Sequence, residues 1–170
     1  MLGAYFAVKK YAVCHEVGLP VYDKDGARHG TRMRADFLAV RSDLKDVAIV
    51  ETKSCWSDFA SDLKWADYLP FCNRLYFAAD PDTAERIKLA IGNEHPEVGV
   101  IAVARDFNPH AVTDSLRFIK VARKRPSDVP VTDLLWQMAA RSSGFDIAGR
   151  LHCGNAFENQ SCAWLNFRVR

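Results

Sequence analysis

The sequence predicts an α/β fold, an α/β/α sandwich with helices on both faces of a mixed central sheet. Two apolar runs on either side of the polar turn Arg41–Asp46 predict a strand hairpin. Residues 56–71 carry apolar side chains close to the period of a helix. The apolar runs 74–79 and 99–104 are typical of covered strands, which are often parallel. A hairpin, a helix and two covered strands in this order favour a mixed sheet.

The start of the chain is predicted from periodicity and turn residues. A short helix is expected over residues 3–10 and a strand over residues 11–17. Residues 19–32 contain a proline and two glycines, which favour a loop or an irregular hairpin. The first strand is therefore expected to be short.

The second half of the chain contains a helix capped by Asp82, then an edge strand and a last helix. We expect one domain over residues 1–170, with its core at about 11–125 and a C-terminal helix and irregular tail at 130–170. These elements are expected at residues 83–91 (helix), 116–122 (edge strand) and 132–141 (helix), with a loop at 107–114.

Composition sets only broad limits on function. With 170 residues, 49% of them hydrophobic, the chain can bury a core of its own. A net charge of +2 neither indicates nor opposes nucleic-acid binding. Five cysteines without a CxxC pair indicate neither a disulfide framework nor a zinc knuckle. No signal segment or membrane-length apolar run is found, so we expect a cytoplasmic protein without a membrane partner.

Three charged residues next to the predicted hairpin strands are candidates for catalysis. Asp36 precedes one strand, and Glu51 and Lys53 end the other. Alternation places Glu51 and Lys53 on one face, and the hairpin brings Asp36 beside them. Carboxylates are ligands for hard cations such as Mg²⁺, and a nearby lysine can hold or deprotonate a water. The competing interpretation is a surface ion pair between Glu51 and Lys53.

The motif Asp-x(n)-Glu-x-Lys resembles the active-site signature of the PD-(D/E)XK, restriction-endonuclease-like nucleases, although Ala35 stands where that name has proline. The stretch from residue 12 to residue 80 is also similar to the MmcB-like family, which is expected to contain DNA-repair nucleases. That similarity rests on Arg-Ala-Asp (34–36), Glu-x-Lys-Ser (51–54), Asp-Phe-x-x-Asp-x-Lys-Trp-x-x-Tyr (58–68) and Cys-x-Arg-Leu-x-Phe-Ala (72–78). The superfamily core has the order αβββαβ, which matches the predicted elements.

The resemblance implies roles for the site residues. Asp36 and Glu51 would hold one or two Mg²⁺ (or Mn²⁺) ions, with the Thr52 carbonyl as a further ligand. Glu16 would be a third acidic ligand, or else an exposed glutamate at a strand end. Lys53 would orient or deprotonate the attacking water.

Nucleic-acid contacts are expected on both sides of this site. Arg28, Arg32 and Arg34 crowd the segment before Asp36, where a phosphate backbone would lie; a solvated loop is the alternative. Lys64 and Tyr68 share one face of the predicted helix and echo the Gln-x-x-x-Tyr element of recombination-type nucleases. Lys64 could instead belong to a solvent-facing stripe and pair with a neighbouring aspartate.

The sequence thus predicts a metal-dependent nuclease that hydrolyses DNA, in repair or recombination. Two alternatives stay open: a non-catalytic nucleic-acid-binding protein on the same fold, and an RNA-directed nuclease, since no element reads the 2′-hydroxyl recognisably. The expected partners are DNA, with RNA not ruled out, and a second copy of the chain in a homodimer.

Overall fold

The structure is a computed structural model that describes residues 2–23, 25–26, 28–104 and 115–143, without the side chains of residues 28–32. The loop expected at 107–114 and the tail expected beyond 143 lie outside these residues. The elements are α1 (Leu2–Val8), β1 (Tyr11–Tyr22), β2 (Arg28–Arg41), β3 (Val47–Thr52), α2 (Trp56–Ser61), the 3-10 helix η1 (Trp65–Phe71), β4 (Arg74–Ala79), α3 (Pro81–Ile91), β5 (Val98–Val103), β6 (Leu116–Lys120) and α4 (Val131–Ser143).

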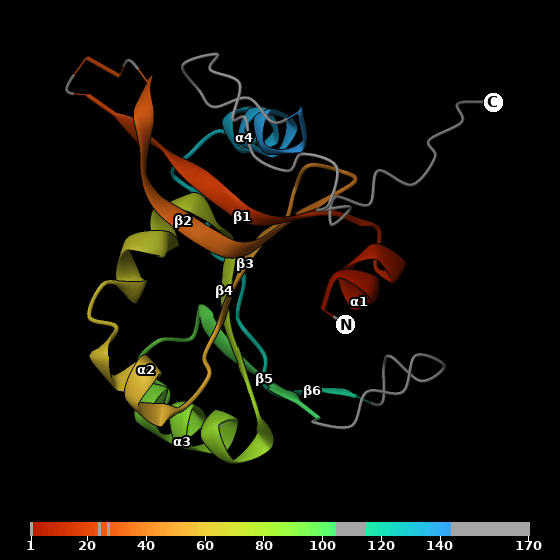
Figure 1. Ribbon diagram of the computed structural model, residues 1–170, viewed down its shortest axis with the longest axis vertical. Helices are drawn as coiled ribbons and strands as arrows, with labels where there is room; N and C mark the ends of the chain where they lie inside the picture. Colours follow the sequence, from red (N-terminus) through yellow and green to blue (C-terminus); the bar gives the residue numbers. More distant parts are fainter. Residues whose placement is uncertain (1, 24, 27, 105–114, 144–170) are drawn as a thin grey trace.

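The six strands form one mixed sheet in the order of the chain (Figure 1). β1, β2 and β3 are antiparallel to one another in turn. β3, β4 and β5 run parallel, and β6 returns antiparallel to β5. The predicted mixed sheet is confirmed, and β6 is an edge strand as expected.

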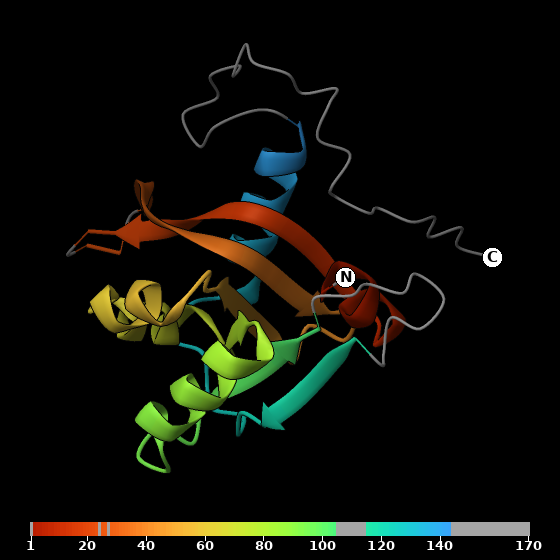
Figure 2. The ribbon, with the colours of Figure 1, turned by 60° about the horizontal axis from the view of Figure 1, so that its bottom comes forward.

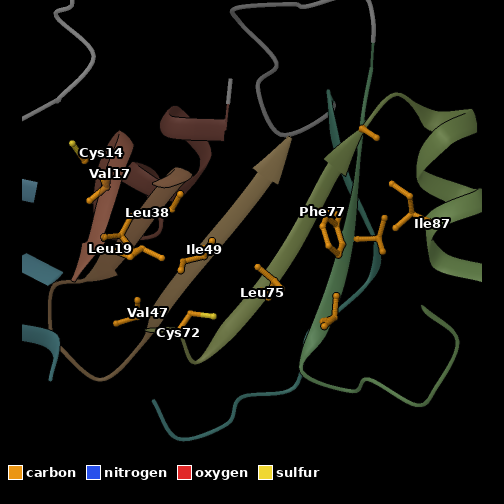
Figure 3. Packing of buried hydrophobic residues seen from close by; sticks show 14 of the residues in the cluster. Cys14, Val17, Leu19, Leu38, Val47, Ile49, Cys72, Leu75, Phe77 and Ile87 are labelled. Atoms are coloured by element: carbon orange, nitrogen blue, oxygen red, sulfur yellow. The ribbon is translucent and has the colours of Figure 1, made fainter. Parts of the chain in front are cut away.

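Helices cover the two faces of the sheet unequally (Figure 2). On one face α2, α3 and α4 bury Phe59, Ile87 and Leu134 in a single cluster with strand residues such as Ile49 and Leu75. Figure 3 shows this cluster across β3 and β4. On the other face, α1 contributes Phe6 to a smaller cluster on the same strands. The predicted fold class is confirmed, and among the described elements α1 is the one helix on its face.

The β1–β2 hairpin is longer than predicted. Strand pairing continues from Tyr11 opposite Arg41 to Tyr22 opposite Arg28, so of the two structures expected at 19–32, a loop or an irregular hairpin, the irregular hairpin is confirmed. The register shifts on both sides of Pro20, which has no N–H to donate to a ladder. β1 is an edge strand, where proline is tolerated, and the strand therefore passes through Pro20 instead of ending there.

The helix expected over residues 56–71 is broken at Asp62. α2 ends at Ser61, and a 3-10 helix begins at Trp65. The Asp62 carboxylate accepts a hydrogen bond from the Lys64 backbone N–H at 3.1 Å. Such side-chain bonds to the local backbone compete with a helix, which explains the break. The helical period of residues 56–71 predicts that Leu63 packs inward with Phe59. This prediction is wrong, because the break turns Leu63 outward, with 88% of its surface exposed.

The remaining predictions are close to the observed elements. α3 begins at Pro81, and its cap is Asp80, whose side chain accepts from the N–H groups of Asp82 and Thr83. Pro81 fits this first helical position because its missing N–H would have no partner there. None of the described helices is long and apolar enough to cross a membrane.

Candidate active site

β2 and β3 separate where the predicted catalytic residues lie. Their ladder ends at the pair formed by Phe37 and Val50. Past this pair, the Asp36 backbone N–H donates to Glu51 Oε1 at 3.2 Å, and the Thr52 N–H donates to Asp36 Oδ2 at 2.8 Å. The Thr52 hydroxyl donates to the same oxygen at 2.7 Å. The hairpin thus brings the Asp36 and Glu51 side chains together, and each carboxylate accepts a hydrogen bond from the backbone of the opposite strand.

Glu51 is a buried carboxylate whose negative charge is not fully compensated by nearby positive charge. Its residue is 5% exposed. Burial, followed by the negative charge of Asp36, raises the pKa of Glu51 to about 7. The Asp36 N–H, the Lys53 ammonium and the Tyr68 hydroxyl act in the opposite direction without cancelling the effect. Because the whole shift opposes the charged form, a cation bound here would stabilise Glu51.

Lys53 forms its ion pair with Asp62. Lys53 Nζ lies 2.7 Å from Asp62 Oδ2, and the two side chains are 7% and 19% exposed. The ammonium also lies 5.8 Å from the centre of the Phe77 ring. Glu51 is buried and Lys53 is bonded to Asp62, so the exposed Glu51–Lys53 pair of the alternative interpretation is not what the structure contains. Asp62 therefore fixes the position of the Lys53 ammonium.

Tyr68 closes the site from the side of η1. Its hydroxyl donates to the Arg34 carbonyl at 3.0 Å. Burial and the negative charges of Glu51 and Asp36 raise the pKa of Tyr68, so the hydroxyl remains a donor at neutral pH. Tyr68 therefore lies on the side of η1 that faces the two carboxylates.

Lys64 does not point toward the carboxylates as Tyr68 does, because the break in the helix removes the face that the two residues would have shared. Lys64 is exposed, and within the described part of the chain its ammonium makes no ion pair. Trp65 is half-buried, with its ring 6.1 Å from that of Phe77 and 5.0 Å from that of His95. Of these three residues, only Tyr68 reaches the carboxylates.

Glu16 lies across from Asp36 in an unusual backbone conformation. It sits between His15 and Val17, which pair with Phe37 and Ala35 on β2. Its φ of 56° is in the left-handed region, which costs a non-glycine residue about 1–3 kcal/mol and is found preferentially at functional sites. The side chain forms a 2.6 Å ion pair with Arg34 Nε. In this structure Glu16 is thus engaged with an arginine.

We call the point where β2 and β3 separate, with Asp36, Glu51 and Lys53, the strand fork. The oxygen atoms at this fork are of the type that binds a hard divalent cation. Among the described residues no group of three or more His, Cys, Asp or Glu side chains is arranged to hold a metal. Mg²⁺, however, is usually bound through one or two carboxylates, with waters and substrate phosphates completing its shell. Asp36 and Glu51 supply two carboxylates. The Thr52 N–H points toward Asp36. Because the N–H and the carbonyl of one residue point to the same side of a strand, the Thr52 carbonyl is expected to face Asp36 as well.

The basic residues differ in how far the structure describes them. Arg28 and Arg32 belong to β2, but their side chains lie outside the described atoms. Arg34 is exposed beside the fork. A second basic cluster after β6 is tied into the fold, since Lys124 and Arg125 donate to the carbonyls of Lys45 and Leu69. That second cluster is therefore structural in large part.

Asp62 is the site residue that sequence reasoning missed. On an unbroken helix Asp62 and Lys64 would not share a face, because residues two apart lie on nearly opposite sides of a helix. Its signal was its place in the spaced motif Asp58 to Tyr68, which contains two aspartates as well as the lysine and tyrosine. Only the helix break lets Asp62 turn back to Lys53.

The fold and the site together define an α/β protein with a mixed six-stranded sheet and a cluster of two carboxylates and a lysine where two strands part. A family model described as DNA repair protein MmcB-like matches residues 10–124. The chain belongs to this MmcB-like family. No curated protein matches the chain significantly.

A solved structure shares the fold. The SPO1766 protein of unknown function from Silicibacter pomeroyi superposes with a TM-score of 0.60 at 17% sequence identity. The match covers 84% of this chain and 81% of that protein. At this identity the similarity supports the mixed-sheet architecture alone.

Proposed function

We propose that this protein is a divalent-metal-dependent nuclease that hydrolyses phosphodiester bonds of DNA during repair. Membership of a family described as DNA repair proteins supports the process and the substrate. The observation that carries the chemistry is Glu51, a buried carboxylate whose pKa is raised to about 7 beside a second carboxylate. This arrangement costs the fold stability at neutral pH, and perturbed carboxylates of this kind cluster at functional sites, where a bound cation would offset the cost.

Each residue of the fork has a distinct task in this proposal. Asp36 and Glu51 would hold Mg²⁺ or Mn²⁺, with the Thr52 carbonyl as a third oxygen ligand. The bound cation would polarise the scissile phosphate and lower the pKa of an attacking water. Lys53 would orient that water and stabilise the developing negative charge through its ammonium.

Asp62 and Tyr68 act in this proposal as positioning residues. The 2.7 Å ion pair with Asp62 holds the Lys53 ammonium at the end of β3. An ammonium already paired with a carboxylate is better suited to orienting a water than to removing its proton. Tyr68 links η1 to the backbone of β2 at Arg34, close to the strand fork.

A non-catalytic DNA-binding protein is the second candidate. The observation in its favour is that the described residues contain no ready three-ligand metal group. A protein of this kind would bind DNA through its basic residues and would gain nothing from Mg²⁺. Melting temperature measured against Mg²⁺ and Mn²⁺ concentration separates the two candidates, because binding to the folded state raises stability.

A substrate panel tests the proposal. Purified protein would be incubated with single-stranded, duplex, flap and junction DNA, and with single-stranded RNA, in the presence of Mn²⁺ or of EDTA. We expect cleavage of at least one DNA substrate with Mn²⁺ and none with EDTA. The Glu51→Gln variant controls for contaminating nucleases. DNA binding without cleavage of any DNA would favour the second candidate, and cleavage of RNA alone would overturn the choice of substrate.

A further inference from the structure

A pocket of about 520 Å³ lies on the face of the sheet that α1 covers, opposite the helices that border the candidate active site. Its size falls within the 300–1,000 Å³ typical of small-ligand sites. We call it the rear pocket and define it by Tyr5, Lys9, Arg41, Asp46, Arg74 and Phe118. The fork residues Asp36, Glu51 and Lys53 are not among its lining residues.

Aromatic rings form one wall of the rear pocket. The Tyr5 and Phe118 rings lie 5.0 Å apart, and the Phe118 ring meets that of Tyr76 edge-on at 5.3 Å. Gly99 leaves room for the Tyr76 ring, because a Cβ at that position would overlap the ring. Tyr76 is buried behind Phe118, and the half-buried rings of Tyr5 and Phe118 offer flat surfaces to a ligand.

A buried acid organises the opposite, polar wall. The Asp46 side chain is 3% exposed and accepts a hydrogen bond from the Tyr11 hydroxyl at 2.9 Å. Arg74 Nε lies 3.3 Å from Asp46, and the Arg41 guanidinium lies 3.7 Å from it. Arg74 also donates to the Ala122 carbonyl. These bonds hold both guanidiniums against the pocket.

Positive charge exceeds negative charge in the rear pocket. Its lining contains three basic side chains, Lys9, Arg41 and Arg74, and one acid, Asp46. Asp43, outside the lining, pairs with Arg41 at 2.8 Å and leaves one positive charge in excess. Within the described residues no carboxylate pairs with Lys9, whose ammonium lies 5.9 Å from the centre of the Tyr5 ring. A ligand that fits this pocket carries a negative group beside a flat body.

We propose that the rear pocket binds a nucleotide, with the base against the aromatic wall and the phosphate beside Lys9. Aromatic rings combined with basic side chains are the means by which proteins bind single-stranded nucleic acid. A free nucleotide and the end of a single strand share this chemistry. The site would be separate from the strand fork and would need no metal.

Isothermal titration calorimetry in EDTA, without divalent metal, tests the proposal. The ligands are deoxyadenosine monophosphate, deoxyadenosine, inorganic phosphate and an eight-residue deoxyadenosine strand. Laurate is added as an anion that carries an apolar chain in place of a flat base. We expect the monophosphate to bind at least about tenfold more tightly than deoxyadenosine or phosphate alone. A strand that binds more tightly than the monophosphate identifies the strand as the source of the ligand, and the reverse order identifies the free nucleotide.

Two variants link this binding to the rear pocket. Lys9→Gln removes the unpaired charge, and Tyr5→Leu replaces a flat ring by an apolar group; each should weaken binding about tenfold. Lys88→Gln, on α3 at the opposite face, should leave the affinity unchanged. Nucleotide affinity unaffected by the pocket variants, no nucleotide or strand binding at all, or displacement of the nucleotide by laurate would each overturn the proposal. Circular dichroism spectra of the variants check that they are folded.

Discussion

Lys53 and Asp62 form a 2.7 Å ion pair between the end of β3 and the break between α2 and η1. Both side chains are largely buried, so each depends on the other for charge compensation. The same Asp62 carboxylate interrupts the helix by bonding the Lys64 N–H at 3.1 Å. One residue therefore shapes the local chain and positions the lysine of the candidate site.

Removing Asp62 should leave Lys53 buried without a partner. We expect Asp62→Asn to lower the free energy of unfolding by on the order of 1–3 kcal/mol, less than for a fully buried pair because Asp62 is 19% exposed. The Lys53→Met/Asp62→Asn double variant should recover part of this loss. Urea unfolding of the two single variants and the double variant measures the coupling. Asp58→Asn, which alters the hydrogen bonds of that side chain to Ser54 and a weaker electrostatic attraction to Lys53, is the control and should cost less than Asp62→Asn. Additive losses at positions 53 and 62 would contradict the pairing.

The raised pKa of Glu51 predicts a pH-dependent stability. The folded protein holds this proton up to a pH of about 7, whereas the unfolded chain releases it near 4.5. The stabilisation of the protonated form is therefore complete below pH 4.5 and is lost as the pH rises to about 7. Relative to Glu51→Gln, wild type should lose on the order of 2–3 kcal/mol over this range without metal. Equal pH profiles for the two proteins would contradict the assignment, and Mg²⁺ should reduce the loss.

The basic residues before the fork predict the salt dependence of DNA binding. The slope of log K against log[salt] is negative. Replacing Arg28, Arg32 and Arg34 together by glutamine should reduce its magnitude by about 0.9 for each duplex DNA phosphate that the protein no longer neutralises. Affinity should fall without a change in sequence preference. Fluorescence anisotropy at several salt concentrations gives the slope. Arg123→Gln is the control, since Arg123 belongs with Lys124 and Arg125 to the second basic cluster after β6. A smaller salt dependence for this variant, with no change for the β2 variant, would place the DNA at the second cluster instead.

The left-handed backbone at Glu16 predicts different effects of two substitutions on stability. Glu16→Gly should stabilise the fold by about 1 kcal/mol, because glycine adopts a φ of 56° without steric cost. Glu16→Gln should have little effect on stability, since its ion pair with Arg34 is exposed. Both should reduce cleavage if the carboxylate takes part in the site. A destabilised Glu16→Gly variant would show that this conformation carries no strain.

Sequence reasoning predicted the centre of the fold better than its edges. The strand with Glu51 and the apolar strands after it were recognisable because covered strands have continuous apolar runs. The outer half of the β1–β2 hairpin was left open between a loop and an irregular hairpin, since Pro20 normally ends a strand and is tolerated here only at the sheet edge. Edge position is a tertiary property that a local pattern does not contain.

The site was predictable to the same degree. Asp36 and Glu51 meet because hairpin register is local, and a turn of known length sets it. The partner of Lys53 depends on the break at Asp62, where one side-chain hydrogen bond outweighs a regular helical period. The pKa of Glu51 is raised mainly by burial, and the spacing of residues along the sequence does not reveal burial.

The most direct test of the proposed nuclease site separates metal binding from cleavage at the fork. Mn²⁺ binding, measured by calorimetry, and cleavage of the best substrate from the panel are compared for wild type, Asp36→Asn, Glu51→Gln and Lys53→Met. We predict that the carboxylate variants lose both properties, whereas Lys53→Met binds Mn²⁺ and loses cleavage by at least about 100-fold. Full cleavage by Lys53→Met, or unchanged Mn²⁺ binding by Glu51→Gln, would contradict the assignment of this site.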